Sequence, residues 1–285
     1  MPRDAHPYRS VLYLPASKER ALAKARTLAA DAIIFDLEDA VAPDAKDAAR
    51  ATLKAALDEG GFGARRRIVR INASDTPWHA DDLAAAAEMQ CDAVLLPKVG
   101  APQDILDAAA ALPGRAIWAM IETAAGVLNA AAIAGAHPAL EGFVLGTNDL
   151  AKELGARPHP DRLPMMTALQ TALLAARMGG LVVVDGVYNA FKDDDGLRRE
   201  CEQGRDLGFD GKTLIHPAQL DITNAVFAPS ADDISLAERQ IAAFDEATAA
   251  GQGVAVVDGR IVENLHVEQA RATLAKARAI EALVG

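Results

Sequence analysis

The sequence is poor in aromatic side chains. Phe, Trp and Tyr make up only 4% of its 285 residues, although 51% of the residues are hydrophobic. The apolar content is therefore mostly Ala, Leu, Val and Ile, which suit close-packed helices and strands that are buried on both faces. A chain of this length can bury a large core and has the usual size of one α/β barrel.

Cysteine is also scarce, and long apolar segments are missing. Cys91 and Cys201 lie far apart, in a spacing that fits neither a metal site nor a redox pair, so we expect packed thiols in a reducing compartment. No apolar segment is long enough to span a membrane, and the first ten residues lack the apolar core of a signal peptide. These features predict a cytoplasmic protein.

Basic residues are in the minority. The chain has 29 Lys and Arg against 40 Asp and Glu, which gives a net charge of −11. A nucleic-acid-binding protein usually has the opposite balance, so we expect no nucleic-acid partner. An anionic substrate must then be held by a local basic cluster, because the overall field of the protein repels it.

Eight short apolar segments recur along the chain, and most are separated by Ala-rich stretches with helical spacing. Each segment is apolar or β-branched on both faces, as in a strand that is covered on both sides. The alternation predicts a parallel sheet, and eight units without a GxGxxG motif after the first strand favour a closed (β/α)8 TIM barrel over an open sheet. The predicted strands are 11–16, 32–38, 67–72, 93–99, 115–122, 142–149, 181–187 and 211–217.

We expect two parts in the chain. Residues 1–229 form the barrel, and residues 230–285 form an extension with a helix at 234–250, an extended piece at 253–262 and a final helix at 268–283. An extension of this length could cap the barrel mouth or reach a neighbouring subunit.

Polar residues gather where the predicted strands end. In barrels of this type, catalytic groups lie at the carboxyl ends of the strands. Any one such residue could simply flank an apolar strand, but the set as a whole predicts an active site at this mouth. Its members are Asp36, Glu38, Asp39, Arg70, Asn72, Lys98, Glu122, Asn148, Asp149, Asp185 and His216.

Two carboxylates in this set suggest a metal site. No nucleophile with a His partner is visible at these ends, and zinc would need more His or Cys ligands than His216 provides. Glu122 and Asp149 come from different strands and are the ligand type that Mg²⁺ prefers. Each has an alternative role, because Glu122 could serve the helix that starts at Thr123, and Asp149 could cap the segment 150–154.

Arg70 is the only guanidinium on a strand end. Beside the acidic run at 36–39 it can bind a carboxylate or stabilise an oxyanion, or it can form a structural salt bridge to that run, and the two roles are compatible. Lys98 could in principle form a Schiff base, but a metal site would already supply the electrophile. His216, before Pro217, is more typical of a hydrogen-bonded structural residue.

Several of these residues lie in segments with a familiar pattern. From about residue 9 to about residue 282, the chain resembles the citrate lyase β-subunit-like branch of the HpcH/HpaI aldolase family, which includes malyl-CoA and citramalyl-CoA lyases and malyl-CoA thioesterases. The segments that carry the resemblance are RSVLYLPAS (9–17), DAIIFDLEDAVAPDAKDAAR (31–50), IVRIN (68–72), LLPKV (95–99), IETAAGVLNA (121–130), LGTNDLAKELG (145–155) and GFDGKTLIHPAQL (208–220).

The resemblance implies roles for individual residues. It implies Mg²⁺ on Glu122 and Asp149, a substrate-binding Arg70, and an acidic run whose Asp36, Glu38 and Asp39 support the metal's waters and the arginine. In the family the CoA arm lies near the end of the first strand. This makes Lys18, Arg20 and Lys24 candidates for its phosphates, which also suits a basic cluster at a helix start, although an ordinary solvated helix face would look the same.

The chain departs from the family pattern at two places. Ala16 stands where the family commonly has Gly, and Glu263 stands where it usually has Asp; the following residues 264–266 also differ. The resemblance implies that Glu263 is the acid/base group, which reaches over from a neighbouring subunit of a homo-trimer or hexamer. Its longer side chain bears on the identity of the acyl substrate and on the choice between cleavage and hydrolysis.

The resulting prediction is a Mg²⁺-dependent carbon–carbon lyase. It would cleave a 3-hydroxyacyl-CoA of malyl-CoA type into acetyl-CoA and an α-keto acid such as glyoxylate, through an enolate that Arg70 stabilises and Glu263 protonates. Three alternatives stay open: a malyl-CoA thioesterase that gives malate and CoA, a citrate lyase β-type subunit that acts on an acyl-carrier thioester, and a barrel without catalysis.

Overall fold

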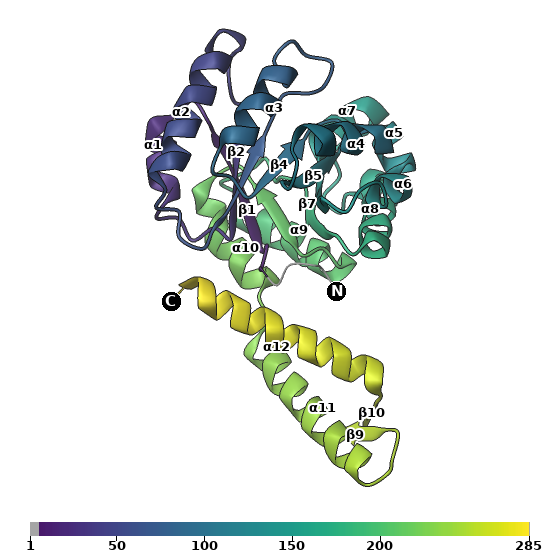
Figure 1. Ribbon diagram of the computed structural model, residues 1–285. Coiled ribbons are helices and arrows are strands. Elements are labelled where there is room, and N and C mark those ends of the chain that lie inside the picture. The colour runs from purple at the N-terminus through teal and green to yellow at the C-terminus, as the bar shows by residue number, and fades with distance from the viewer. Residues whose placement is uncertain (1–5, 285) are drawn as a thin grey trace. The chain divides into compact units, whose positions relative to one another are not determined.

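A closed barrel of parallel strands forms the larger part of the protein (Figure 1). The computed structural model describes residues 6–284, and the barrel unit within it spans residues 8–227. Its strands, each paired with the next and the last with the first, are β1 (Ser10–Pro15), β2 (Ala32–Asp36), β3 (Arg66–Arg70), β4 (Ala93–Leu96), β5 (Ala116–Ile121), β6 (Leu140–Leu145), β7 (Val182–Asp185) and β8 (Gly211–Leu214). The predicted (β/α)8 barrel is confirmed.

Helices surround the barrel and bury their apolar sides against the strands. In the described part of the chain, none of the helices is long and apolar enough to cross a membrane. The α-helices of this unit are α1 (Glu19–Ala25), α2 (Lys46–Glu59), α3 (His79–Glu88), α4 (Pro102–Ala111), α5 (Ala124–Leu128), α6 (Ala130–Ala134), α7 (Thr147–Leu154), α8 (Met166–Gly179), α9 (Asp194–Leu207) and α10 (Leu220–Phe227), with 3₁₀ turns at Pro43–Ala45, Leu163–Met165 and Pro217–Gln219.

The barrel interior is filled by a second apolar cluster, separate from the strand–helix layer. Trp118 is the largest fully buried side chain and lies in this cluster. Gly142 on the neighbouring strand makes room for it, because a Cβ at this position would lie 2.7 Å from two indole carbons. Side chains therefore fill the interior of the barrel, so a ligand is expected at the ends of the strands.

All eight predicted strands exist, but most end earlier than predicted. The fourth stops at Leu96 instead of residue 99, and the sixth stops at Leu145 because residues 147–154 form α7. The polar residues that the sequence placed on strand ends lie mostly in the loops and helix starts that follow. These segments no longer pair with the neighbouring strands and lie at the mouth of the barrel, so their side chains and backbone can face a ligand.

Residues 228–284 belong to a second compact unit. Helices α11 (Ala231–Ala249) and α12 (Asn264–Val284) pack against each other, and a hairpin of β9 (Ala255–Val257) and β10 (Arg260–Val262) joins them (Figure 1). Ser230 and Asp233 form a capping box that begins α11, a pairing that satisfies two otherwise free helix N–H groups. A capping role for this unit stays a prediction.

Candidate active site

A cavity of about 360 Å³ opens at the carboxyl ends of the strands. Its size suits a small-molecule site. It collects side chains and backbone that are far apart in the sequence, all of them from the barrel unit. Its lining includes Tyr13, Pro15, Asp36, Asp39, Arg70, Met120, Glu122, Gly146, Thr147, Asn148, Asp149, Val187 and Thr213.

Arg70 is fixed by three carboxylates. The register of β2 and β3 places Asp36 beside Arg70, and the Asp36 carboxylate accepts from Nε and Nη2 at 2.7 Å each. Nη1 lies 2.9 Å from Glu38 Oε2, and Nη2 lies 3.4 Å from Asp39. Burial opposes the charge of Arg70, but the hydrogen bonds to Asp36 hold its pKa above the usual value. The predicted salt bridge to the acidic run therefore exists.

The acidic run carries more charge than Arg70 can balance. Burial raises the pKa of Glu38 to about 7; Arg70 opposes this shift, and Asp39 and Asp36 reinforce it. Near neutral pH the Glu38 carboxyl group is therefore present in both its protonated and its ionised form. This side of the cavity holds one fixed cation within an excess of carboxylates.

Two residues that the sequence analysis missed also hold Arg70. The guanidinium carbon lies 5.0 Å from the centre of the Tyr13 ring, and Nη1 lies 3.9 Å from the sulfur of Met120. Such stacking suits the planar, weakly hydrated guanidinium. Burial raises the pKa of Tyr13, so its hydroxyl stays protonated. Arg70 thus has little freedom to change its position.

Glu122 is buried, with one oxygen left without a partner. Its Oε1 accepts from the Lys98 N–H at 2.8 Å, whereas Oε2 has no hydrogen-bond partner among residues 6–284. Burial raises the pKa of Glu122 to about 8; the Lys98 N–H opposes this shift, and Glu38 and Asp149 reinforce it. A buried carboxylate oxygen of this kind calls for a proton or a cation.

Lys98 contributes through its backbone. Its φ of 52° is rare for a residue other than glycine, and this conformation directs the N–H to Glu122. Its side chain is exposed and is absent from the cavity lining, so the structure offers no support for a Schiff base.

Neither Glu122 nor Asp149 is the N-cap of a helix. Thr123 is the N-cap of α5, and its hydroxyl accepts from the Gly126 N–H at 3.0 Å. Helix α7 begins at Thr147 after Gly146, so Asp149 lies inside the first turn and not at the cap. Both Glu122 and Asp149 line the cavity instead.

Gly146 lets the β6–α7 turn approach Glu122. A Cβ at this position would overlap both the Glu122 Cβ and its unpartnered Oε2. Only a residue without a side chain allows this approach, so Gly146 is a site residue that the sequence analysis missed.

The donor set fits a hard divalent cation. Among the residues that the structure describes, no group of three or more His, Cys, Asp or Glu side chains could hold a metal. Glu122 and Asp149 remain as a pair, and Mg²⁺ accepts one or two carboxylates when substrate and water complete its shell. The unpartnered Oε2 and the raised pKa of Glu122 are what a cation would compensate.

Three of the polar strand-end residues have structural roles instead. Asp185 is buried and pairs with Arg162 at 2.7 Å and with Lys212 at 3.2 Å. Asn72 accepts from Lys46 Nζ and donates to Asp82. His216 caps a 3₁₀ turn and stacks on Phe191, with ring centres 4.6 Å apart. The expectation that the whole set serves one site was therefore too broad.

Four predicted site residues remain, three in the barrel unit and one in the second unit. Lys18, Arg20 and Lys24 are exposed at and along α1. Glu263 is exposed between β10 and α12 in the second unit, and its N–H donates to His266 Nδ1 at 3.1 Å. Their roles stay predictions.

The chain belongs to the HpcH/HpaI aldolase/citrate lyase family, whose model matches residues 9–217. This confirms the predicted family. The chain is 66% identical over 282 residues to the (3S)-malyl-CoA thioesterase of Cereibacter sphaeroides (strain ATCC 17029 / ATH 2.4.9), covering 99% of each chain. It is 34% identical to the L-malyl-CoA/beta-methylmalyl-CoA lyase of the same strain, over 98% of this chain and 97% of the lyase.

A solved structure supports the same relationship. Protein CitE from Mycobacterium tuberculosis, in complex with magnesium, acetoacetate and coenzyme A, superposes with a TM-score of 0.81 at 32% identity, and covers 96% of this chain and 100% of that one. The enzyme family is therefore established. The lyase prediction is not confirmed, because the relative with far higher identity is a thioesterase.

Proposed function

We propose that this chain is a Mg²⁺-dependent thioesterase that hydrolyses a malyl-CoA-type thioester to malate and free CoA. The observation that carries the proposal is the 66% identity to a (3S)-malyl-CoA thioesterase along 99% of both chains. The corresponding identity to a malyl-CoA lyase is 34%. Hydrolysis thus replaces carbon–carbon cleavage as the preferred reaction.

Glu122 and Asp149 would hold the metal. Support comes from the buried, unpartnered Oε2 of Glu122, from Asp149 in the same cavity, and from a structural relative that contains magnesium. When bound, Mg²⁺ supplies positive charge that polarises a carbonyl oxygen and acidifies water. Glu122 itself must lose its proton to become a ligand, and its raised pKa makes that step dependent on pH.

Arg70 binds the substrate carboxylate and stabilises the negative charge that develops on oxygen. Asp36, Glu38 and Asp39 keep the guanidinium in one orientation, and Tyr13 and Met120 limit its movement from the other side. A positioned charge of this kind needs little rearrangement during the reaction.

Two further roles belong to the same proposal. Lys18, Arg20 and Lys24 provide exposed positive charge for the phosphates of CoA. Glu263 transfers the proton of the attacking water and reaches the cavity from a neighbouring subunit of a trimer or hexamer. A group in this role contributes about 10²–10⁴-fold to the rate.

Product analysis tests the proposal. The purified chain is incubated with Mg²⁺ and malyl-CoA, and malate, free CoA, glyoxylate and acetyl-CoA are quantified separately. Malate and free CoA without glyoxylate support hydrolysis. Glyoxylate and acetyl-CoA in equal amounts would show a lyase, the second candidate, which the 34% identity along nearly the whole chain keeps open.

A substitution of the proposed metal ligand tests whether turnover takes place in this cavity. Glu122→Gln keeps the size of the side chain but removes its negative charge, so turnover should fall by at least about 10³-fold if metal and substrate binding fail together. The isolated chain is assayed without any acyl-carrier protein. Full activity under these conditions would exclude a subunit that needs a carrier-bound thioester.

A further inference from the structure

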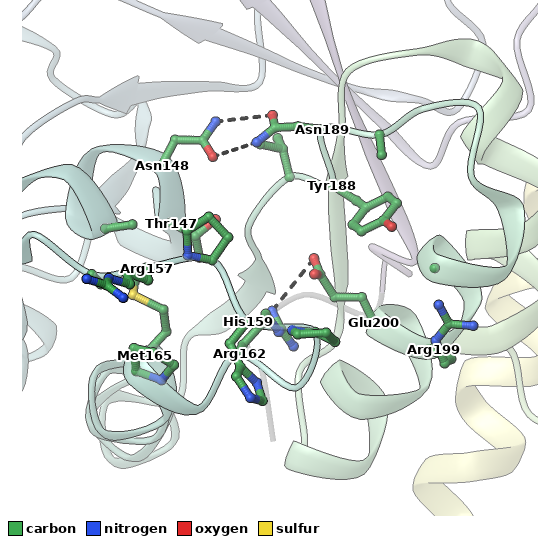
Figure 2. Close-up of a pocket in the computed structure, with 18 of the residues that line it drawn as sticks. Thr147, Asn148, Arg157, His159, Arg162, Met165, Tyr188, Asn189, Arg199 and Glu200 are labelled. Atoms are coloured by element: carbon green, nitrogen blue, oxygen red, sulfur yellow. Dashed lines mark hydrogen bonds and ion pairs between the residues drawn. The ribbon is translucent and has the colours of Figure 1, made fainter.

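A second and larger cavity, of about 550 Å³ (Figure 2), shares part of its lining with the catalytic one. The first turn of α7, the segments at 156–165 and 187–193, and the first half of α9 form its walls. Thr147, Asn148 and Val187 line both cavities. The proposed hydrolysis uses none of the groups found only in the second cavity.

Arg162 is held rigidly in the wall of this cavity. Its Nε donates to Gln203 Oε1 at 2.7 Å, and its Nη1 donates to both oxygens of Asp185 at 2.7 Å. Its backbone has a φ of 52°, in the left-handed region that non-glycine residues rarely adopt. Strained backbone of this kind is concentrated at functional sites. The side chain is only 9% exposed, so the guanidinium is positioned in advance.

One end of this guanidinium lacks an acceptor. Arg162 Nη2 is buried and forms no hydrogen bond within the described residues 6–284. A buried, charged donor without an acceptor destabilises the protein. A carboxylate from outside the chain would satisfy it, because carboxylate oxygens match the geometry of guanidinium N–H groups.

Two more arginines line the same cavity, closer to solvent. Arg157 follows α7 and Arg199 lies on α9, and Figure 2 shows them on opposite sides of the cavity. Both are exposed, and neither forms an ion pair within the described part of the chain. The cavity thus has positive charge at two depths, from the buried Arg162 and from the exposed Arg157 and Arg199. The chain as a whole has a net charge of −11.

The acidic residues of the cavity are already engaged. The Asp193 carboxylate accepts from the Tyr188 hydroxyl at 2.6 Å and from the Gly196 N–H at 2.9 Å. Glu200 accepts from the buried Lys212 at 2.6 Å. Arg199 interacts with the charge of Asp193 without forming an ion pair, and its guanidinium, like that of Arg157, remains exposed to a ligand. The apolar part of the lining consists of Pro158, Pro160, Pro164, Met165 and the Tyr188 ring.

We propose that this second cavity binds a short-chain dicarboxylate. One carboxylate takes the open N–H groups of Arg162, the carbon chain packs along the proline-lined wall, and the other carboxylate lies near Arg157 and Arg199. The inference does not depend on which bond is broken in the catalytic cavity.

Calorimetric titration of the full chain tests the proposal, with succinate and acetate as probes and no Mg²⁺ or thioester present. Succinate should bind, and acetate should bind at least about tenfold more weakly, since it cannot reach both depths. Arg157→Gln and Arg199→Gln should each weaken succinate binding several-fold. Arg205→Gln is the matched control, because Arg205 lies on the same helix, is exposed and pairs with Asp206. Arg162 itself is left intact, since its substitution would break buried ion pairs.

Arg70→Lys separates the two cavities. Succinate binding should survive this substitution, because Arg70 lines only the catalytic cavity. Binding that is lost in Arg70→Lys but unchanged in Arg157→Gln and Arg199→Gln would place succinate at the catalytic site and overturn the proposal. Equal affinity for acetate and succinate, or no succinate binding at about 10 mM, would overturn it as well. Neither result would bear on hydrolysis of the thioester.

Discussion

The barrel contains two buried arginine–aspartate clusters at its strand ends, and they differ in charge balance. In the first, Arg70 faces Asp36, Glu38 and Asp39. In the second, Arg162 and Lys212 face Asp185 and Glu200. Counted by direct ion pairs, the first has one cation for three acids, whereas the second has two cations for two acids. The buried Lys46 also acts on the acids of the first cluster, at longer range.

The charge balance of each cluster affects the pKa values of its carboxyl groups. Burial acts to raise the pKa of Asp185, but Lys212 and Arg162 hold it below its usual value. In the first cluster Arg70 does not offset burial, and the pKa of Glu38 rises to about 7. A strand-end carboxylate that has its own cation stabilises the fold, whereas unbalanced carboxylates at a cavity are suited to bind a cation or move a proton.

The largest effect is expected from breaking the balanced cluster. Asp185→Asn leaves Lys212 and Arg162 buried with too little negative charge, so the free energy of unfolding should fall by about 3–5 kcal/mol. Urea denaturation followed by circular dichroism measures the change. A loss below about 1 kcal/mol would mean that the cluster is not essential to the fold.

Breaking the unbalanced cluster should affect catalysis more than stability. Arg70→Lys removes the bidentate fork, and kcat for malyl-CoA hydrolysis should fall by about 10²–10³-fold. Arg67→Lys is the control on the same strand, because Arg67 pairs with Asp92 away from the cavity. Equal activity in the two variants would contradict the role of Arg70.

Glu122 should destabilise the metal-free protein at high pH. Its folded pKa of about 8 lies above the usual value of 4.5, so the folded state binds more protons between these values and loses stability as pH rises through them. Glu122→Gln removes this loss and should raise the free energy of unfolding at pH 8 in EDTA by about 1–3 kcal/mol. The gain in the free energy of unfolding should vanish at pH 4, so the same variant measured at pH 4 serves as the control.

The smallest effect is expected at the edge of the unbalanced cluster. Asp39 is 72% exposed and lies 3.4 Å from Arg70, so Asp39→Asn should change the free energy of unfolding by less than about 1 kcal/mol. The same denaturation experiment as for Asp185→Asn measures it. A loss as large as that of Asp185→Asn would remove the distinction between the clusters.

The sequence predicted the barrel because its strands are buried on both faces and therefore appear as separate apolar segments. It also predicted the contact between Arg70 and the run at 36–39, since adjacent parallel strands bring their carboxyl ends together. For the same reason it predicted that Glu122 and Asp149 lie together at the mouth, and both line the cavity. These are properties that chain order and residue type largely determine.

Other parts of the site depend on geometry that residue types do not encode. The backbone role of Lys98 follows from a left-handed φ, and the need for Gly146 appears only once Glu122 is placed beside it. In the sequence pattern Tyr13 is indistinguishable from any other strand residue, although its ring stacks on Arg70. Asp185 looked equivalent to Asp36 because each pairs with a basic residue of the next strand, Lys212 for Asp185 and Arg70 for Asp36. The second cation of Asp185, Arg162, comes from a connecting segment whose position the residue types do not encode.

A proton-linked titration tests most directly whether the unpartnered carboxylate of Glu122 binds Mg²⁺, as we propose. Mg²⁺ binding is measured by calorimetry at several pH values, in buffers with different ionisation enthalpies. With the pKa of Glu122 at about 8, binding at pH 7 should release about one proton, the release should decline toward pH 9, and Glu122→Gln should abolish binding. Mg²⁺ binding that releases no proton at pH 7 and persists in Glu122→Gln would contradict the account.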